Sequence, residues 1–225
     1  MTKNSLLKIA NRLLLPVTCL GCGEEGEWIC SKCLKKLRPA EPVICVLCGK
    51  AADDGLCPKC RKSTRLDGAI TLFSYQEKIM QELVKTAKYA GNFDALKFFG
   101  EKFGSTYRRL LDKDQWVFCY IPISAERLKE RGFNQAEELA RAIGGQDFPA
   151  KNLLKKIKDT PQQVKQNRKI RLKNVQGSLA VRGIVPAQVV ICDDVITTGS
   201  TLKEAAKALR KAGAKKVIAL TIAHG

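Results

Sequence analysis

The chain has 225 residues, of which 45% are hydrophobic and 28% are charged, a balance that excludes a disordered protein and allows a proper core. Lys and Arg number 40 against 22 Asp and Glu, so the formal charge is +18, which argues against an acidic scaffold and favours a polyanionic partner or substrate. No run approaches about 18 uninterrupted apolar residues, so the sequence predicts no membrane-spanning helix.

The first expected element is a short amphipathic helix at residues 6–17, which Pro16 ends. A lipoprotein signal ending at Cys19 is disfavoured, because Thr18 stands where a small Gly or Ala is usual and further paired cysteines follow. We therefore expect no secretion and no stable membrane insertion. A membrane-surface or partner-docking role for this helix stays open.

Eight of the ten cysteines follow, in four C-x-x-C pairs. Two residues between cysteines let one short turn present two sulfurs to one ion, and two such turns complete a tetrahedron. The segment therefore predicts two structural zinc sites with four thiolates each and no open position for catalysis. The predicted ligands are Cys19, Cys22, Cys30, Cys33, Cys45, Cys48, Cys57 and Cys60.

Sequential pairing of these cysteines is the simpler arrangement, and an interleaved pairing stays open. An iron–sulfur cluster is a rival occupant, because four sulfurs suit both metals. Disulfides are disfavoured by the missing signal peptide and by the large cysteine-poor part that follows. The composition changes at about residue 62, which predicts a cysteine-rich module over residues 1–62 and a second domain over residues 63–225.

Strand and helix patterns alternate along the second part. Continuous apolar strands that alternate with helices predict an α/β fold with a parallel sheet covered on both faces. We expect strands at residues 69–75, 116–123, 188–192 and 217–223, and helices at residues 77–90, 93–111, 134–143 and 200–212.

Residues 151–182 are polar and carry ten basic side chains against one acid, half of the chain's excess charge. The segment is interpreted as a mobile lid over pyrophosphate, as an arm that follows a nucleic-acid backbone, or as a solvated basic face. It has no interleaved aromatic residues, so binding to nucleic acid should be salt-sensitive and poorly sequence-specific. The basic residues predicted to contact nucleic acid are Lys155, Lys156, Lys165, Arg168, Lys169, Arg171 and Lys173.

The most informative stretch lies at residues 189–201. An apolar strand ends in Asp193 and Asp194, a loop rich in hydroxyls follows, and a helix begins at once. The N–H groups of such a loop and of the helix N-terminus bind phosphate, and Gly199 allows close approach of the backbone. The carboxylates suit ribose hydroxyls, which donate hydrogen bonds to them. The pattern predicts a site for a 5-phosphorylated ribose, whereas a simple capped helix would need neither acid.

Residues 193–201 resemble the 5-phosphoribosyl-1-pyrophosphate (PRPP) motif of type I phosphoribosyltransferases. Residues 121–123, Arg127 and residues 131–135 resemble the signature of ComF-type competence proteins, and the front end is similar to the double zinc ribbon of that family. A later series of residues continues the resemblance, so that it covers nearly the whole chain. That series is Thr160, Gln163, Arg171, Asn174 and Gly177.

The resemblance implies a type I phosphoribosyltransferase fold, with a five-stranded, mostly parallel sheet and a flexible loop over the site. It also implies that the two acids hold the ribose hydroxyls, that residues 197–201 hold the 5′-phosphate, and that Mg²⁺ bridges oxygens of PRPP. A catalytic residue stays unassigned. The implied PRPP-binding residues are Asp193, Asp194, Thr197, Thr198, Gly199, Ser200, Thr201, Ser124 and Arg127.

The favoured function is that of a ComF-type competence protein, which binds single-stranded DNA in the cytoplasm during natural transformation and DNA uptake. The resemblance implies a ComF-type helicase partner and a retained PRPP site. The alternative is an active phosphoribosyltransferase of nucleotide metabolism, a pentosyl-transferring enzyme whose acceptor stays open. A zinc-dependent structural scaffold is a third hypothesis, and it leaves the phosphate loop without a role.

Overall fold

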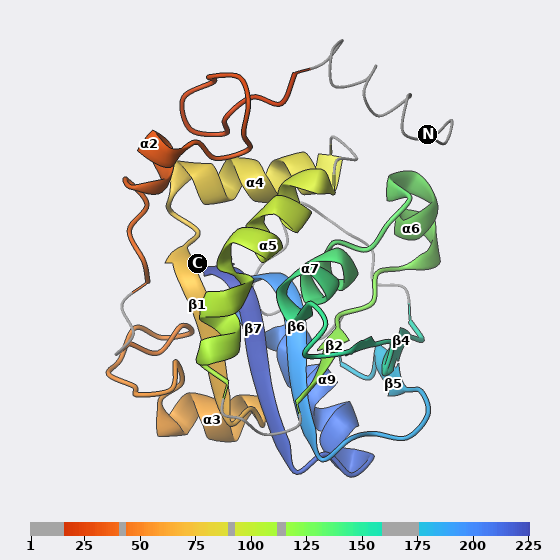
Figure 1. Ribbon diagram of the computed structural model, residues 1–225. Coiled ribbons are helices and arrows are strands. Elements are labelled where there is room, and N and C mark those ends of the chain that lie inside the picture. The colour runs from red at the N-terminus through yellow and green to blue at the C-terminus, as the bar shows by residue number, and fades with distance from the viewer. Residues whose placement is uncertain (1–15, 41–43, 90–92, 112–115, 159–175) are drawn as a thin grey trace.

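The computed structural model describes residues 16–40, 44–89, 93–111, 116–158 and 176–225 (Figure 1). Most of the amphipathic helix expected at residues 6–17 lies outside the described residues. So does most of the basic segment, including Lys165, Arg168, Lys169, Arg171 and Lys173. No helix in the described ranges is long and apolar enough to cross a membrane.

A five-stranded sheet forms the centre of the molecule, with the strand order β1-β7-β6-β2-β3 (Figure 1). Every neighbouring pair in it is parallel, which confirms the predicted α/β fold. The central strands are buried on both faces, which explains why they read as continuous apolar runs. The strands are β1 (Gly68–Ser74), β2 (Val117–Tyr120), β3 (Ala150–Lys151), β6 (Gln188–Ile196) and β7 (Lys216–His224).

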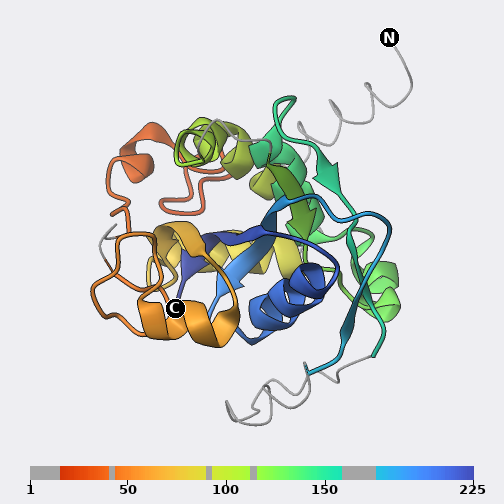
Figure 2. The ribbon, with the colours of Figure 1, turned by 90° about the horizontal axis from the view of Figure 1, so that it is seen from below.

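Helices cover both faces of the sheet (Figures 1 and 2). α5 and α7 lie together on one face, and α9 and α3 lie together on the other. α4 lies beyond the carboxyl ends of the central strands, and the short α2 and α6 flank the sheet (Figure 1). The helices are α2 (Ser31–Leu34), α3 (Pro58–Thr64), α4 (Lys78–Tyr89), α5 (Asp94–Arg109), α6 (Ala125–Arg131), α7 (Gln135–Gly144) and α9 (Ser200–Lys211).

A glycine allows the close packing of α5 on α7. A Cβ atom placed at Gly100 would lie only 2.4 Å from the Cβ of Ala142, so no larger residue fits there without a shift. At the other end of α5, the buried hydroxyl of Tyr107 donates a hydrogen bond of 2.7 Å to the carbonyl of Thr221 on β7. These contacts hold the helical layer against the sheet.

Strand β6 is longer than the sequence predicts. The apolar run predicts a strand that ends before the acid pair, but β6 continues through both acids to Ile196. β7 pairs with β6 as far as the register of Ile196 with His224, so ladder hydrogen bonds carry the strand past its apolar run. The acids therefore project from a strand near its carboxyl end.

A small antiparallel sheet holds the two ends of the basic segment. β4 (Leu154–Lys156) pairs with β5 (Leu179–Val181), and Lys156 lies opposite Leu179 (Figure 1). The backbone N–H of Gly177 donates 2.9 Å to the carboxylate of Glu204 on α9. The described ends of the segment are thus fixed to each other and to α9.

The part of the cysteine-rich module that follows α2 lies along the outer edge of β1 (Figure 1). Pro39 forms an antiparallel bridge with Phe73, and the N–H of Ala69 donates 2.9 Å to the carbonyl of Asp54. These contacts cover the free edge of the sheet, which would otherwise expose unpaired backbone groups. α3 runs through residue 62, and the division of the chain at that residue stays a prediction.

Candidate functional site

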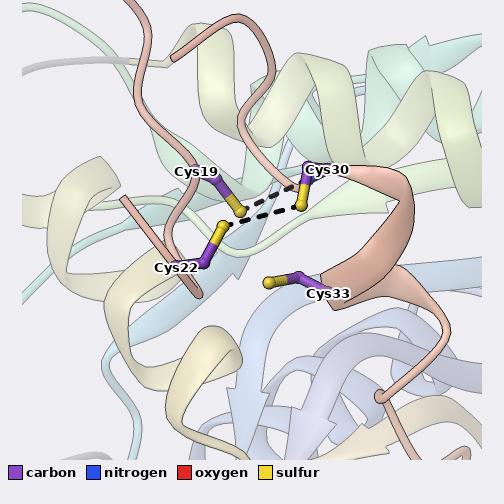
Figure 3. A group of neighbouring side chains, drawn as sticks. All are labelled: Cys19, Cys22, Cys30 and Cys33. Atoms are coloured by element: carbon purple, nitrogen blue, oxygen red, sulfur yellow. Dashed lines mark hydrogen bonds between the residues drawn. The ribbon is translucent and has the colours of Figure 1, made fainter. Parts of the chain in front are cut away.

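Two clusters of four cysteines form, and in each the sulfur atoms lie within 4.8 Å of one another (Figure 3). The Sγ atoms of Cys22 and Cys30 are 3.7 Å apart, and those of Cys48 and Cys57 are 3.6 Å apart. A tetrahedral zinc site with Zn–S bonds of about 2.3 Å places its sulfurs about 3.8 Å apart, so the clusters fit zinc. The structure groups the cysteines sequentially: Cys19, Cys22, Cys30 and Cys33, then Cys45, Cys48, Cys57 and Cys60.

The environment of the first cluster suits thiolate ligands. The backbone N–H groups of Gly21 and Cys30 point at the Sγ atom of Cys19, at 3.4 and 3.3 Å. Burial alone would raise the pKa of Cys19, but these backbone donors outweigh it and lower the pKa to about 6. Burial and the neighbouring thiols instead raise the pKa of Cys33 to about 12. Four thiolates therefore require a cation between them, and the two four-cysteine clusters hold structural zinc.

A lysine joins the acid pair at the carboxyl end of β6. The Nζ atom of Lys88 on α4 lies 2.5 Å from Oδ2 of Asp194, and both side chains are partly buried. Burial lowers the pKa of Lys88, but the charge of Asp194 more than compensates, so the pKa is raised. Sequence reasoning missed Lys88, because nothing in the helical pattern separates it from the other lysines of α4.

The pKa of Asp193 is raised by its surroundings. Burial and the charge of Asp194 raise the pKa of Asp193 to about 7, against the smaller opposing effects of the Asp194 backbone N–H and of Lys88. That N–H lies 2.9 Å from Oδ1 of Asp193. Asp193 therefore changes its charge near neutral pH, where it can accept or release a proton as a ligand binds.

A cavity of about 200 Å³ opens beside the acid pair. It collects predicted PRPP residues from three places in the chain: Arg127, Asp193, Asp194 and Thr201. Its wall also includes residues outside that predicted set, namely Lys88, Arg131, Asn134, Gln135 and Lys156. The cavity thus joins two carboxylates to several cationic and amide side chains.

Two donors in the cavity wall lack partners. The Nε atom of Arg131 and the Nε2 atom of Gln135 are buried and have no hydrogen-bond partner among the described residues. The side chains of Arg127 and Arg131 add positive charge to the same wall. The wall therefore fits an anionic ligand such as pyrophosphate. Sequence reasoning could have found Arg131, since it lies in the motif that carries the family resemblance.

Other residues of that motif shape the backbone. Ser124 is buried and caps α6, and its Oγ accepts a hydrogen bond of 3.4 Å from the backbone N–H of Arg127. Asn134 accepts from the N–H of Ala136 at 3.0 Å and donates to the carbonyl of Ile121 at 3.0 Å. The asparagine therefore holds the turn before α7 against the end of β2. A substrate contact of Ser124 stays a prediction.

The phosphate loop leads from β6 into α9. Gly199 adopts the left-handed conformation with φ of 68°, and α9 begins at the next residue. The hydroxyls of Thr198 and Ser200 lie 2.6 Å apart, and Thr197 is exposed. Thr201 lines the cavity, and the four other loop residues directly precede it in the chain. The arrangement places N–H groups of a helix N-terminus next to the acid pair, which suits a sugar phosphate.

The residues predicted to bind nucleic acid divide into two groups. Lys155 and Lys156 lie on β4, and Lys156 reaches the cavity. Lys165, Arg168, Lys169, Arg171 and Lys173 lie outside the described residues, so their contribution stays a prediction.

Two domain families match the chain. A phosphoribosyl transferase domain model matches residues 128–225, and a double zinc ribbon domain model matches residues 10–61. These matches confirm the predicted fold of the sheet domain and the zinc-ribbon nature of the cysteine clusters.

Curated relatives cover most of the chain. It is 29% identical to Competence protein ComFC of Bacillus subtilis, over 83% of this chain and 80% of the relative. It is 28% identical to Competence protein ComFC of Streptococcus pneumoniae, over 96% and 93% of the two chains. Competence protein F of Haemophilus influenzae is 39% identical over 43% of this chain and 45% of its own.

Proposed function

Because this chain belongs to the ComF family, in which a double zinc ribbon precedes a phosphoribosyltransferase domain, we propose that it binds PRPP with Mg²⁺ and handles single-stranded DNA in natural transformation. One observation carries the sugar-phosphate part of the proposal. The cavity places an acid pair, the first turn of α9 and the side chains of Arg127 and Arg131 around one space. Diol, phosphate and pyrophosphate each find matching chemistry there.

Each part of PRPP has a proposed set of residues. Asp193 and Asp194 accept hydrogen bonds from the ribose hydroxyls, and Lys88 balances their charge. The loop at residues 197–201 holds the 5′-phosphate through backbone N–H groups and hydroxyls. Arg127 and Arg131 face the pyrophosphate. Mg²⁺ would neutralise pyrophosphate charge through oxygen ligands, with the acid pair as the nearest carboxylates.

The DNA part of the proposal rests on charge. The chain carries a formal charge of +18, and the basic segment at residues 151–182 supplies half of it. Lys156 both lines the cavity and belongs to this segment, so bound DNA and bound PRPP would influence each other. A ComF-type helicase partner and a cytoplasmic location belong to the same proposal and follow from the family resemblance.

Phosphoribosyl transfer is the second candidate function, and the complete acid pair with its adjoining cavity favours it. An acceptor would displace pyrophosphate at the anomeric carbon of PRPP. The residues of the site would act by positioning the substrate and stabilising charge. This candidate differs from the first in that pyrophosphate is released.

Calorimetric titration of the zinc-loaded protein with PRPP and Mg²⁺, with and without single-stranded DNA, tests the proposal. Saturable heat supports the PRPP site, and a change of affinity with DNA supports coupling. A folded, zinc-loaded protein that gives no heat would overturn the sugar-phosphate part. Release of pyrophosphate in the same mixture would favour the transferase candidate.

A further inference from the structure

The second zinc ribbon lies directly against the phosphate loop. A Cβ atom placed at Gly199 would lie 3.0 Å from Cδ2 of Leu47 and 3.7 Å from Cγ2 of Thr64. These two apolar groups therefore pack on the backbone of the loop at its left-handed residue. Two segments that are distant in the chain meet there.

Both contacting side chains are fixed by the second cysteine cluster. Leu47 is one of the two residues between Cys45 and Cys48. Thr64 ends α3, and its hydroxyl donates a hydrogen bond of 2.7 Å to the carbonyl of Cys60. A metal that holds these cysteines therefore also sets the position of the surface on which the loop rests.

The far end of α9 is tied to the same part of the chain. The Nε atom of Arg210 donates 3.0 Å to the carbonyl of Arg65, and its guanidinium pairs with Asp67 at 2.5 Å. α3 and α9 consequently lie side by side (Figure 2). The helix that presents its N-terminus to the site is thus braced at both ends.

The first zinc ribbon has a different neighbour. Leu20, within its first C-x-x-C turn, lines a hollow together with Ile79 of α4. The first ribbon includes α2 and lies beside α4 (Figure 1), whereas the second ribbon includes α3, which lies beside α9 (Figure 2). Each ribbon therefore has a leucine within its first C-x-x-C turn. Leu47 of the second ribbon contacts the phosphate loop, and Leu20 of the first ribbon lies against α4 instead.

We propose that Leu47 is a positioning residue for the 5′-phosphate: the second zinc ribbon forms the outer wall that holds the loop at Gly199 in its binding conformation. The inference rests on the proposed PRPP site. A phosphate site works through N–H groups that already point at one spot, so a loop that loses its wall loses affinity for the phosphate. The pyrophosphate side, formed by Arg127 and Arg131 of another segment, does not depend on Leu47.

Leu47→Ala tests this inference, with Leu20→Ala as the matched control. Calorimetry with ribose 5-phosphate and with inorganic pyrophosphate separates the two sides of the site. We expect Leu47→Ala to weaken ribose 5-phosphate binding by about tenfold and to leave pyrophosphate binding unchanged. Leu20→Ala should change neither, and Leu47→Met, which still fills the contact, should restore ribose 5-phosphate binding.

Hydrogen exchange gives a readout that needs no ligand. The amides of residues 198–201 should exchange faster in Leu47→Ala than in wild type or in Leu20→Ala, while both variants keep two zinc ions per chain. Unchanged exchange and unchanged ribose 5-phosphate affinity would overturn the inference, as would an equal loss in the two variants. A wild type that binds neither ligand would refute the proposed function instead, and the exchange rates would still decide whether Leu47 holds the loop.

Discussion

Lys88 neutralises part of the negative charge of Asp193 and Asp194, two adjacent carboxylates that are partly buried in the fold. Its Nζ atom lies 2.5 Å from Asp194, and the same ion pair keeps α4 over the end of β6. The hydroxyls of a bound ribose must therefore compete with Lys88 for the carboxylate oxygens of the acid pair. The charge of the site at neutral pH depends on these three side chains together.

Removal of Lys88 should destabilise the protein. Lys88→Met leaves two partly buried carboxylates without their cation, so we expect a loss of about 1–2 kcal/mol at about pH 8. Lys85→Met is the matched control, because Lys85 lies on the same helix in an exposed pair with Glu82. Urea unfolding measures both variants. Equal stability of the two variants would show that Lys88 does not neutralise the acid pair.

The pKa of Asp193 predicts a pH dependence of stability. Burial and the charge of Asp194 raise it from 3.8 to about 7, so between these values the folded chain holds a proton that the unfolded chain has released. Stability should therefore fall as the pH rises from about 4 to about 7, and Asp193→Asn should remove this part of the slope. Relative to wild type, the stability of Asp193→Asn should increase by up to about 4 kcal/mol between about pH 4 and about pH 8, at about 1.4 kcal/mol per pKa unit. Thermal melts measure both proteins at the two pH values. A difference in melting temperature between Asp193→Asn and wild type that is the same at both pH values would contradict the raised pKa.

At the scale of elements, the zinc ribbons act as external supports for the sheet domain. The second ribbon and the segment before it cover the free edge of β1, and each ribbon lies against a different helix next to the candidate site. Thiolate clusters of this kind fold when metal binds, so the support depends on zinc. Small ribbons with few apolar residues can thereby hold a surface against a much larger domain.

The grouping of the cysteines can be tested by zinc content. A double variant of Cys19→Ser and Cys33→Ser removes two ligands of the first cluster and should lose one zinc per chain. Cys19→Ser with Cys60→Ser removes one ligand from each cluster and should lose both. Metal analysis of the folded proteins measures the result. Loss of both ions from the first double variant as well would instead require Cys19 and Cys33 to lie in different clusters, as in an interleaved pairing.

At the scale of the whole molecule, the chain carries a strong positive charge, which does not contribute to the packing of the apolar core. Lysines and arginines exceed acids by 18, and the basic segment that concentrates them begins at the rim of the cavity. Such a segment binds polyanions by releasing counterions, which makes affinity fall steeply with salt. This arrangement would bring a DNA backbone close to the sugar-phosphate site.

Neutralising this segment should flatten the salt dependence of DNA binding. Changing Lys155, Lys156, Lys165 and Lys169 to Gln should reduce the slope of log K against log salt by about 3, at about 0.7 per lost phosphate contact. The matched control changes four lysines on and beside α9, namely Lys203, Lys207, Lys211 and Lys215. Fluorescence anisotropy with a labelled oligothymidine gives both slopes. A larger effect of the control set would place the DNA on α9.

Local sequence determined much of this protein. The C-x-x-C spacing sufficed for the two zinc sites, because two ligands on one short turn need only the residues between them. The acid pair and the phosphate loop were equally visible, since a strand, a loop and a helix N-terminus follow one another without a gap. The parallel sheet followed from apolar strands that alternate with helices.

Tertiary structure decided what depends on contacts between distant segments. The ion pair of Lys88 with Asp194 and the packing of Leu47 on Gly199 join residues whose spacing carries no pattern. The structure also confirms the sequential grouping of the cysteines, where the sequence had left an interleaved pairing open. Even the length of β6 was set by its pairing with β7 and not by its own apolar run. A side chain's neighbours across the fold depend on how whole elements pack, and a sequence pattern records only the periodicity within each element.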